Sequence, residues 1–118
     1  MAPSSNTART EAEALLRRLT MRNLRSREIR TGIYWTGVLT LDGQPILQVT
    51  QTGRGEATRY EPATGSDFAS ARKIEALLTG ACTVLGLGDF EALDALTSAM
   101  ENGQTGFDAL SLARSAME

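Results

Sequence analysis

The feature that most constrains this fold is the pair Asp42-Gly43, which has strand-forming residues on both sides. From Ile33 onward, aromatic and β-branched residues recur with a period of two, which predicts extended structure. Asp-Gly is a preferred pair for a tight turn between antiparallel strands. The sequence therefore predicts a central β-hairpin that turns at Asp42-Gly43.

Two registers are open for this hairpin. A two-residue turn pairs Leu39 with Ile46 but leaves a poorly apolar face, whereas a three-residue loop with a bulge at Gly43 sets Leu39 against Pro45. We prefer the bulged register because it gathers apolar side chains on one face: Ile33, Trp35, Leu39, Leu47 and Val49. The other face is half polar and suits solvent or a partner: Tyr34, Thr36, Val38, Thr40, Ile46, Gln48 and Thr50.

A third strand is predicted at Glu56–Glu61, after a turn at residues 52–55. Pro45 cannot donate to a strand ladder, so the second strand meets this neighbour just past Pro45 or lies at an edge there. A three-stranded antiparallel meander results.

A first helix is predicted before the meander. Thr10 and Glu13 have the spacing of a capping box, so we expect the helix to begin near Thr10 and to end around Arg22 or Asn23. Its core face repeats at helical spacing: Ala12, Leu15, Leu16 and Leu19.

Further helices are predicted after the meander. Ser66 or Asp67 can cap a second helix, and the helix either stops at Gly80 or runs on through Thr83. Its apolar side carries Phe68, Ala71, Ile74, Leu77 and Leu78. In the tail, residues 90–101 match residues 107–118 at seven of twelve positions, which predicts two short helices packed on the sheet, with Asp89 and Thr105 as caps and a break at Asn102-Gly103. We expect the Phe and Met positions of this repeat to lie in the core.

Length and composition predict one α+β domain. With 118 residues and 42% apolar content, the chain can build one core, which we place at residues 10–118, with residues 1–9 disordered. No stretch reaches the ~18 apolar residues of a membrane span, and the first residues do not have the pattern of a secretion signal. We therefore expect a cytoplasmic protein without a membrane anchor.

Catalytic, metal and cofactor sites are not predicted. The chain has no histidine and one cysteine, Cys82, in an apolar run that favours burial. Its glycine pairs are too short to specify a phosphate loop. Glu56, Glu61 and Asp67 could supply an acid and a base, but no spacing fixes their separation. We expect a protein that is not an enzyme.

Charge is unevenly distributed along the chain. Residues 1–60 hold nine Arg against five Asp or Glu (+4), and residues 61–118 hold three Arg or Lys against nine (−6). Six arginines fall between Arg17 and Arg30, and Arg18, Arg22 and Arg25 would form one solvated stripe if the first helix continued that far. This cluster predicts an electropositive patch.

The order helix, three strands, helix is also that of double-stranded RNA-binding domains. Those domains grip phosphates with lysines at the start of their last helix. Here that helix opens with Ser66-Asp67-Phe68-Ala69, which is acidic and argues against that mode.

The hairpin segment supports a resemblance. It reads Tyr34-Trp35-Thr36-Gly37, Leu41-Asp42-Gly43, Gly53-Arg54-Gly55 and Tyr60. This aromatic strand, D-G turn and G-x-G turn resemble small proteins of phages, prophages and other mobile elements. The resemblance covers about 30 residues and implies a context in which such proteins bind a host or phage protein, as anti-CRISPR inhibitors do.

Three functional hypotheses follow. The leading one is a protein-binding module of a mobile element that inhibits a host nuclease or CRISPR-type defence complex by occlusion. Its predicted contacts are Tyr34, Thr36, Arg54, Arg59 and Tyr60, because aromatic residues and Arg are enriched in interface anchors, although Tyr60 suits the core equally well. The alternative is nucleic-acid binding through Arg18, Arg22, Arg25, Arg27 and Arg30. The third is self-association, for instance as a homodimer, through an open sheet edge or the Ala-rich tail.

Overall fold

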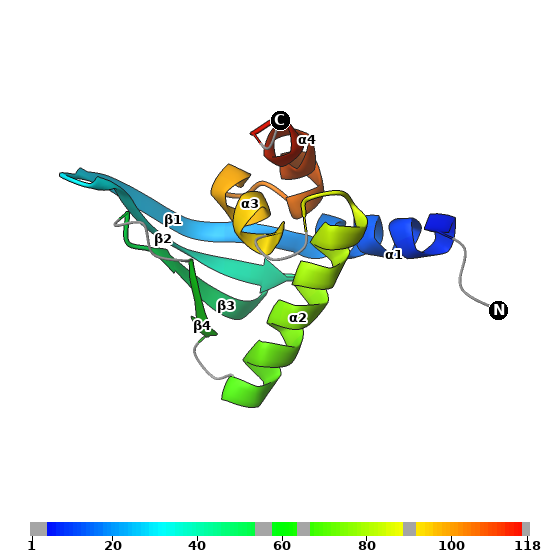
Figure 1. The fold of residues 1–118 in the computed structure, drawn as a ribbon. Coiled ribbons are helices and arrows are strands. Elements are labelled where there is room, and N and C mark those ends of the chain that lie inside the picture. The colour runs from blue at the N-terminus through cyan, green and yellow to red at the C-terminus, as the bar shows by residue number, and fades with distance from the viewer. Residues whose placement is uncertain (1–4, 54–57, 64–66, 89–91, 117–118) are drawn as a thin grey trace.

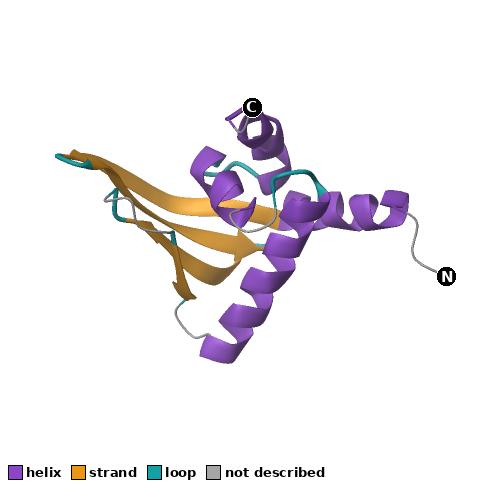
Figure 2. Ribbon diagram, in the orientation of Figure 1, coloured by secondary structure: helices purple, strands orange, loops and turns teal. Residues whose placement is uncertain are grey.

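The computed structural model describes residues 5–53, 58–63, 67–88 and 92–116. In these ranges the chain forms four helices and one antiparallel sheet with strand order β1-β2-β3-β4 (Figures 1 and 2). The elements are α1 (Ser5–Arg18), β1 (Leu19–Ile29), β2 (Gly32–Leu41), β3 (Gln44–Gln51), β4 (Arg59–Pro62), α2 (Phe68–Val84), α3 (Ala92–Ala99) and α4 (Gly106–Ala116). The α+β class is confirmed, but the sheet has four strands where three are predicted.

Helix α1 differs from its prediction at both ends. It begins at Ser5, so Thr10 lies inside the helix and does not cap it, and the segment before Thr10 is helical from Ser5 onward rather than disordered. The helix ends at Arg18 and does not reach Arg22 or Asn23. The missing helical turn is the start of β1.

Strand β1 forms because its first apolar side chains alternate. Leu19 and Met21 are fully buried, which is the two-residue period of a strand. The register with β2 then slips between Arg22 and Arg25. Asn23 lies at this bulge with a φ of 53°, a left-handed conformation that asparagine adopts more readily than most residues.

The β2–β3 hairpin turns on two residues, so the predicted three-residue loop is wrong. Asp42 and Gly43 have φ values of 53° and 82°, as the preferred two-residue hairpin turn requires. The bulge lies instead inside β3, and it sets Leu39 opposite Leu47 rather than Pro45. The predicted faces survive, because this pairing differs from the prediction by two residues, and strand faces repeat every two residues.

The apolar face of this hairpin is buried for most of its length. Leu39, Leu47 and Val49 are fully buried, and Trp35 is half-buried against the core. Ile33 is 57% exposed, which corrects its predicted core position. It lies in the part of the β1–β2 hairpin that projects beyond the helices (Figure 1); we call residues 25–36 the arm.

Two residues predicted on the exposed half-polar face, Thr40 and Ile46, are buried. Ile46 lies at the β3 bulge, where the alternation of side chains is interrupted. The Thr40 hydroxyl donates to the carbonyl of Thr20 on β1 at 3.4 Å. The half-polar surface is therefore shorter than predicted.

The predicted third strand is found as β4, although residues 54–57 lie outside the described residues. Its pairing with β3 runs from Leu47 opposite Pro62 to Thr50 opposite Arg59. The second strand of the hairpin thus meets its neighbour just past Pro45, as predicted.

Helix α2 begins after Asp67, one of its two predicted caps, and follows the longer of its two predicted courses. Asp67 accepts the amide hydrogen of Ser70 at 2.7 Å. The helix continues through Gly80 to Val84, and Gly86, just past the C-cap, has a φ of 89°. The amide of Gly86 donates to the Thr83 carbonyl, and the amide of Leu87 donates to the Cys82 carbonyl. These are the two hydrogen bonds of a Schellman motif.

The apolar side of α2 is only partly covered. Ala71 and Leu78 are buried and Ile74 packs against the core, but Phe68 and Leu77 are 60% and 58% exposed. These last two are corrections to the predicted core.

The tail forms the two predicted helices, α3 and α4, which pack with the other helices on one side of the sheet (Figure 1). Thr105 caps α4 by accepting the amide of Asp108 at 3.1 Å, whereas the predicted cap Asp89 lies outside the described residues. Met100 is buried and Phe107 is half-buried against the core, as predicted.

Candidate interaction surface

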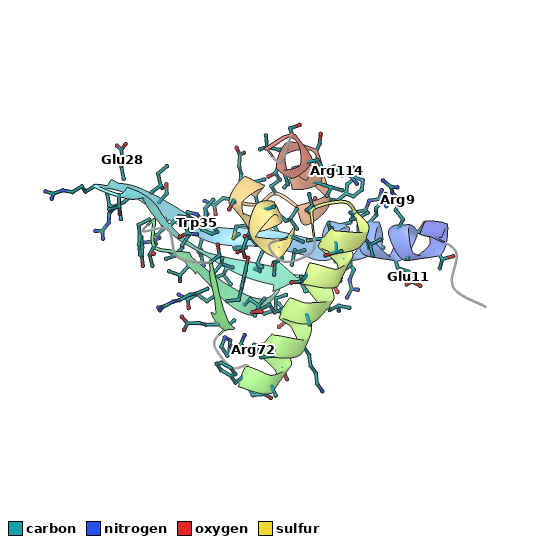
Figure 3. All side chains as sticks on the ribbon, viewed as in Figure 1. Arg9, Glu11, Glu28, Trp35, Arg72 and Arg114 are labelled. Atoms are coloured by element: carbon teal, nitrogen blue, oxygen red, sulfur yellow. The ribbon has the colours of Figure 1, made fainter. Side chains whose placement is uncertain are left out.

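One face of the sheet is left uncovered by the described helices. Cross-strand pairs share a face, and the register places on this one Arg22, Arg25, Arg27, Tyr34, Thr36, Val38, Gln48, Thr50, Arg59 and Glu61. We call these residues the open sheet face. Its charged side chains are all exposed. Glu28, by contrast, points to the other side of the arm (Figure 3).

A continuous row of paired residues crosses the open sheet face. Arg25 is opposite Thr36, Thr36 is opposite Thr50, and Thr50 is opposite Arg59. Three strand spacings separate the two arginines by about 14 Å at their Cα atoms. The row therefore ends in a guanidinium at each edge of the sheet and carries small hydroxyl side chains between them.

The open sheet face is basic although the chain is acidic. Four arginines and Glu61 give it a charge of +3, so the rest of a chain of net charge −2 carries −5. Within the described ranges, no salt bridge neutralises Arg22, Arg25, Arg27 or Arg59. These guanidinium groups are available to an acidic partner.

Arg27 is oriented by the ring of Tyr34. Its guanidinium carbon lies 5.5 Å from the ring centroid, within the range of a cation–π contact. Beside this pair, the arm and the end of β3 form a hollow of about 530 Å³. Its lining is Arg27, Ile29, Arg30, Thr31, Tyr34 and Thr52. The structure thus brings Tyr34 from the predicted protein contacts together with Arg27 and Arg30 from the predicted nucleic-acid set.

Arg18 is separate from the other predicted arginines. Its Nε lies 3.0 and 2.9 Å from the two carboxylate oxygens of Asp42, and the Asp42 amide donates to the Arg18 carbonyl at 3.0 Å. The hydrogen bond from Arg18 lowers the pKa of the Asp42 carboxyl below its usual value. Arg18 therefore fastens the end of α1 to the hairpin turn and is not part of the open sheet face.

Tyr60 lies on the helix-covered face and packs against the core, which is the alternative to a surface contact that the sequence left open. Its hydroxyl donates to Asp94 Oδ1 at 2.5 Å and lies 3.2 Å from Thr97 Oγ1. Burial, with the bond to Asp94, raises the pKa of Tyr60 above its ordinary value. The side chain links β4 to α3.

The remaining predicted contact residues and carboxylates do not lie together. Thr36 and Arg59 lie on the open sheet face, whereas Arg54 and Glu56 lie outside the described residues. Asp67 is engaged as the α2 cap, and its hydrogen bond from the Ser70 amide lowers its pKa.

The outer edge of β1 is a feature that the sequence did not reveal. Asn102 bonds to both main-chain groups of Leu24: the Leu24 amide donates to Asn102 Oδ1 at 2.6 Å, and Asn102 Nδ2 donates to the Leu24 carbonyl at 3.1 Å. The two residues are 78 positions apart. The only signal was the Asn102-Gly103 pair, which predicts a turn but not its neighbour.

Cys82 and the described acidic residues do not gather into a further site. Cys82 is buried, which raises the pKa of its thiol to about 12. Among the residues that the structure describes, no group of three or more His, Cys, Asp or Glu could hold a metal ion. None of the described helices is both long and apolar enough to cross a membrane.

Comparison with known proteins identifies no family for this chain. No protein-family model, curated protein or solved structure matches it.

Proposed function

We propose that the chain is a non-enzymatic protein-binding module whose open sheet face docks on an acidic surface of a partner protein. The observation that carries this proposal is the set of four exposed arginines on the uncovered sheet face that form no salt bridge with any residue the structure describes. Arg and Tyr are the residue types most enriched among interface anchors. The threonines between the arginines add hydrogen-bonding groups at low conformational cost.

The charge of the whole chain favours a protein over a nucleic acid. Outside the open sheet face the chain carries −5, so a long polyanion that extends past this face would meet repulsion. A compact acidic patch that matches the open sheet face would not meet this repulsion. Charge complementarity of this kind also speeds association and excludes wrong partners.

The proposal includes a biological context. The resemblance of the hairpin segment to small mobile-element proteins suggests that the partner is a host nuclease or defence complex, which the chain inhibits by covering an acidic functional surface. Expression of the chain in a host with an active defence system should then raise the plating efficiency of a targeted phage. The variant Arg25→Glu/Arg27→Glu should remove that gain.

Nucleic-acid binding is the second candidate, and one observation favours it. Arg22, Arg25 and Arg27 follow one strand, and Arg30 lies at the tip of the same arm. A row of guanidinium groups on a projecting hairpin could follow a phosphate backbone. Binding of this kind would weaken steeply with salt.

Differential capture from a host lysate separates these functions. The wild-type chain and the variant Arg25→Glu/Arg59→Glu are immobilised in parallel, with and without nuclease treatment. The control Arg9→Glu/Lys73→Glu makes the same change in net charge on exposed residues of α1 and α2. Proteins held by wild type and control, resistant to nuclease and lost with the open-face variant support the proposal. Proteins held equally by all three chains would contradict it, and nucleic acid lost with the same variant would establish the second candidate.

A further inference from the structure

The outer edge of β1 is closed as far as Leu24 by a segment that imitates a neighbouring strand. Met21 accepts from the Gly103 amide at 2.7 Å and donates to the Gln104 carbonyl at 3.3 Å. The Asn102 side chain then bonds to the amide and carbonyl of Leu24. In this stretch the outward main-chain groups of β1 are satisfied.

Past Leu24 no described segment covers the edge of β1. Main-chain groups of successive strand residues point to alternate sides, so the outward amide and carbonyl at Leu24 are followed by those of Ser26 and Glu28. No described residue hydrogen-bonds to the main chain at these two positions on that side. An unpaired strand edge of this kind is a template for another strand.

Side-chain positions along this open edge are chemically different on the two faces. On the open sheet face lie Arg25 and Arg27. On the helix side, next to Ser26, lies a small hollow of about 150 Å³. Its lining is largely apolar: Leu24, Ser26, Trp35, Thr97, Ser98 and Met100.

We propose that the edge at Ser26 and Glu28 receives an extended acidic segment of the partner protein as a fifth strand of the sheet. This inference rests on the proposed function and specifies how the partner binds. Main-chain bonds to Ser26 and Glu28 provide affinity, and alternate side chains provide specificity. The residue opposite Ser26 is apolar and enters the hollow, while its two neighbours are acidic and face Arg25 and Arg27.

Charge argues against the other occupants of this edge. A second copy of the chain, paired edge to edge, would bring the Arg25 and Arg27 side chains of both copies close together, and like charges on neighbouring strands destabilise a sheet. A nucleic acid could contact the arginines but cannot continue the main-chain ladder at Ser26. An acidic strand satisfies both the ladder and the arginines.

Fluorescence anisotropy with labelled peptides tests this inference. The probe has the central sequence Thr-Asp-Leu-Asp-Thr, and the control probe has Thr-Lys-Leu-Lys-Thr. Ser26→Pro removes the outward amide without breaking the β1–β2 ladder, since proline is tolerated where a strand amide faces solvent. We expect Ser26→Pro to weaken binding of the acidic probe by about tenfold or more, the size of one lost hydrogen bond or slightly more.

Two further measurements keep the outcome clear. Amide exchange of the wild-type chain should slow at Ser26 and Glu28 when the acidic probe binds, which does not depend on the folding of any variant. Arg25→Glu/Arg27→Glu should reverse the preference toward the lysine probe. Equal binding by Ser26→Pro, or unchanged exchange at both amides, would overturn strand addition.

Strand addition at the β1 edge and docking by the open sheet face can be tested separately. Arg59 is on the far edge of the sheet and does not face the added strand. If Arg59→Glu weakens capture of the partner protein while Ser26→Pro does not, docking uses the sheet face alone, and the strand addition is refuted while the proposed function stands. If neither variant affects capture, both are refuted.

Discussion

The hydroxyl of Tyr60 should contribute measurably to stability, and Tyr60→Phe isolates that contribution. Phenylalanine keeps the ring against the core and removes only the bonds to Asp94 and Thr97. A hydrogen bond to a charged group contributes about 1.5–3 kcal/mol, and Asp94 is half-buried, so we expect a loss of about 1–2 kcal/mol. For a domain of this size that corresponds to a fall in Tm of roughly 4–8 °C.

The same contact predicts a pH dependence. The pKa of Tyr60 is raised in the folded chain, while in the unfolded chain it returns to about 10. Below pH ~10 both states keep the proton and this group adds no pH dependence. Above that pH the unfolded state loses the proton first, so wild-type stability falls by about 1.4 kcal/mol per pH unit from this residue alone. The variant Tyr60→Phe lacks this pH dependence of stability.

Urea unfolding at neutral pH and at pH values above ~10 measures both effects, with Tyr34→Phe as the matched control. The Tyr34 hydroxyl has no hydrogen-bond partner among the described residues, so its removal should change stability little. The stability gap between wild type and Tyr60→Phe should narrow as pH rises above ~10. A gap that is absent at neutral pH, or one that does not narrow in alkali, would refute the reasoning.

Three other predictions concern the edge, a turn and the buried thiol. Asn102→Ala should lower the free energy of unfolding by about 1 kcal/mol and speed amide exchange at Leu24, because two exposed hydrogen bonds are lost. Unchanged exchange at Leu24 would contradict this prediction. Gly53→Ala should cost about 1–3 kcal/mol, since its φ is 75° and a Cβ would lie 2.7 Å from the Ile33 carbonyl oxygen. Gly43→Ala, with open space around it, should cost less in the same unfolding assay, and equal costs would argue against the close approach. Iodoacetamide should label Cys82 at mildly alkaline pH only after denaturation, because burial raises its pKa to about 12, and rapid labelling of the native chain would contradict its burial.

The sequence predicted those parts of the fold that local chemistry determines. The Asp42-Gly43 turn, the Asp67 cap and the Thr105 cap each depend on side chains within three residues, and all three occur. Beyond the β3 bulge, the faces of the hairpin were predicted correctly, because an even shift in pairing leaves the alternation of side chains unchanged.

Strand β1 could not be predicted in the same way. Leu19 continues the leucine spacing of α1, so it fits a helix as well as a strand. The alternation that would identify the strand is broken at the Asn23 bulge after Leu19 and Met21. Pairing with β2 decides between the two structures, and that contact is not local.

The candidate site was predicted in part, for a related reason. Arg22, Arg25 and Arg27 do share a surface, but a strand with a bulge brings them together rather than a helical stripe. Arg59 joins them only through the order of the four strands. The sequence places Arg18 in the patch because it does not show the ion pair with Asp42, which lies 24 positions away.

The most direct test of the account is an amide hydrogen-exchange footprint of the chain in complex with the protein recovered by differential capture. The account predicts slowed exchange in β1 and β2 along the arm and in β4 around Arg59, with α4 unchanged. Protection confined to the helices, with the arm and β4 exchanging as in the free chain, would contradict the claim that the open sheet face is the docking surface.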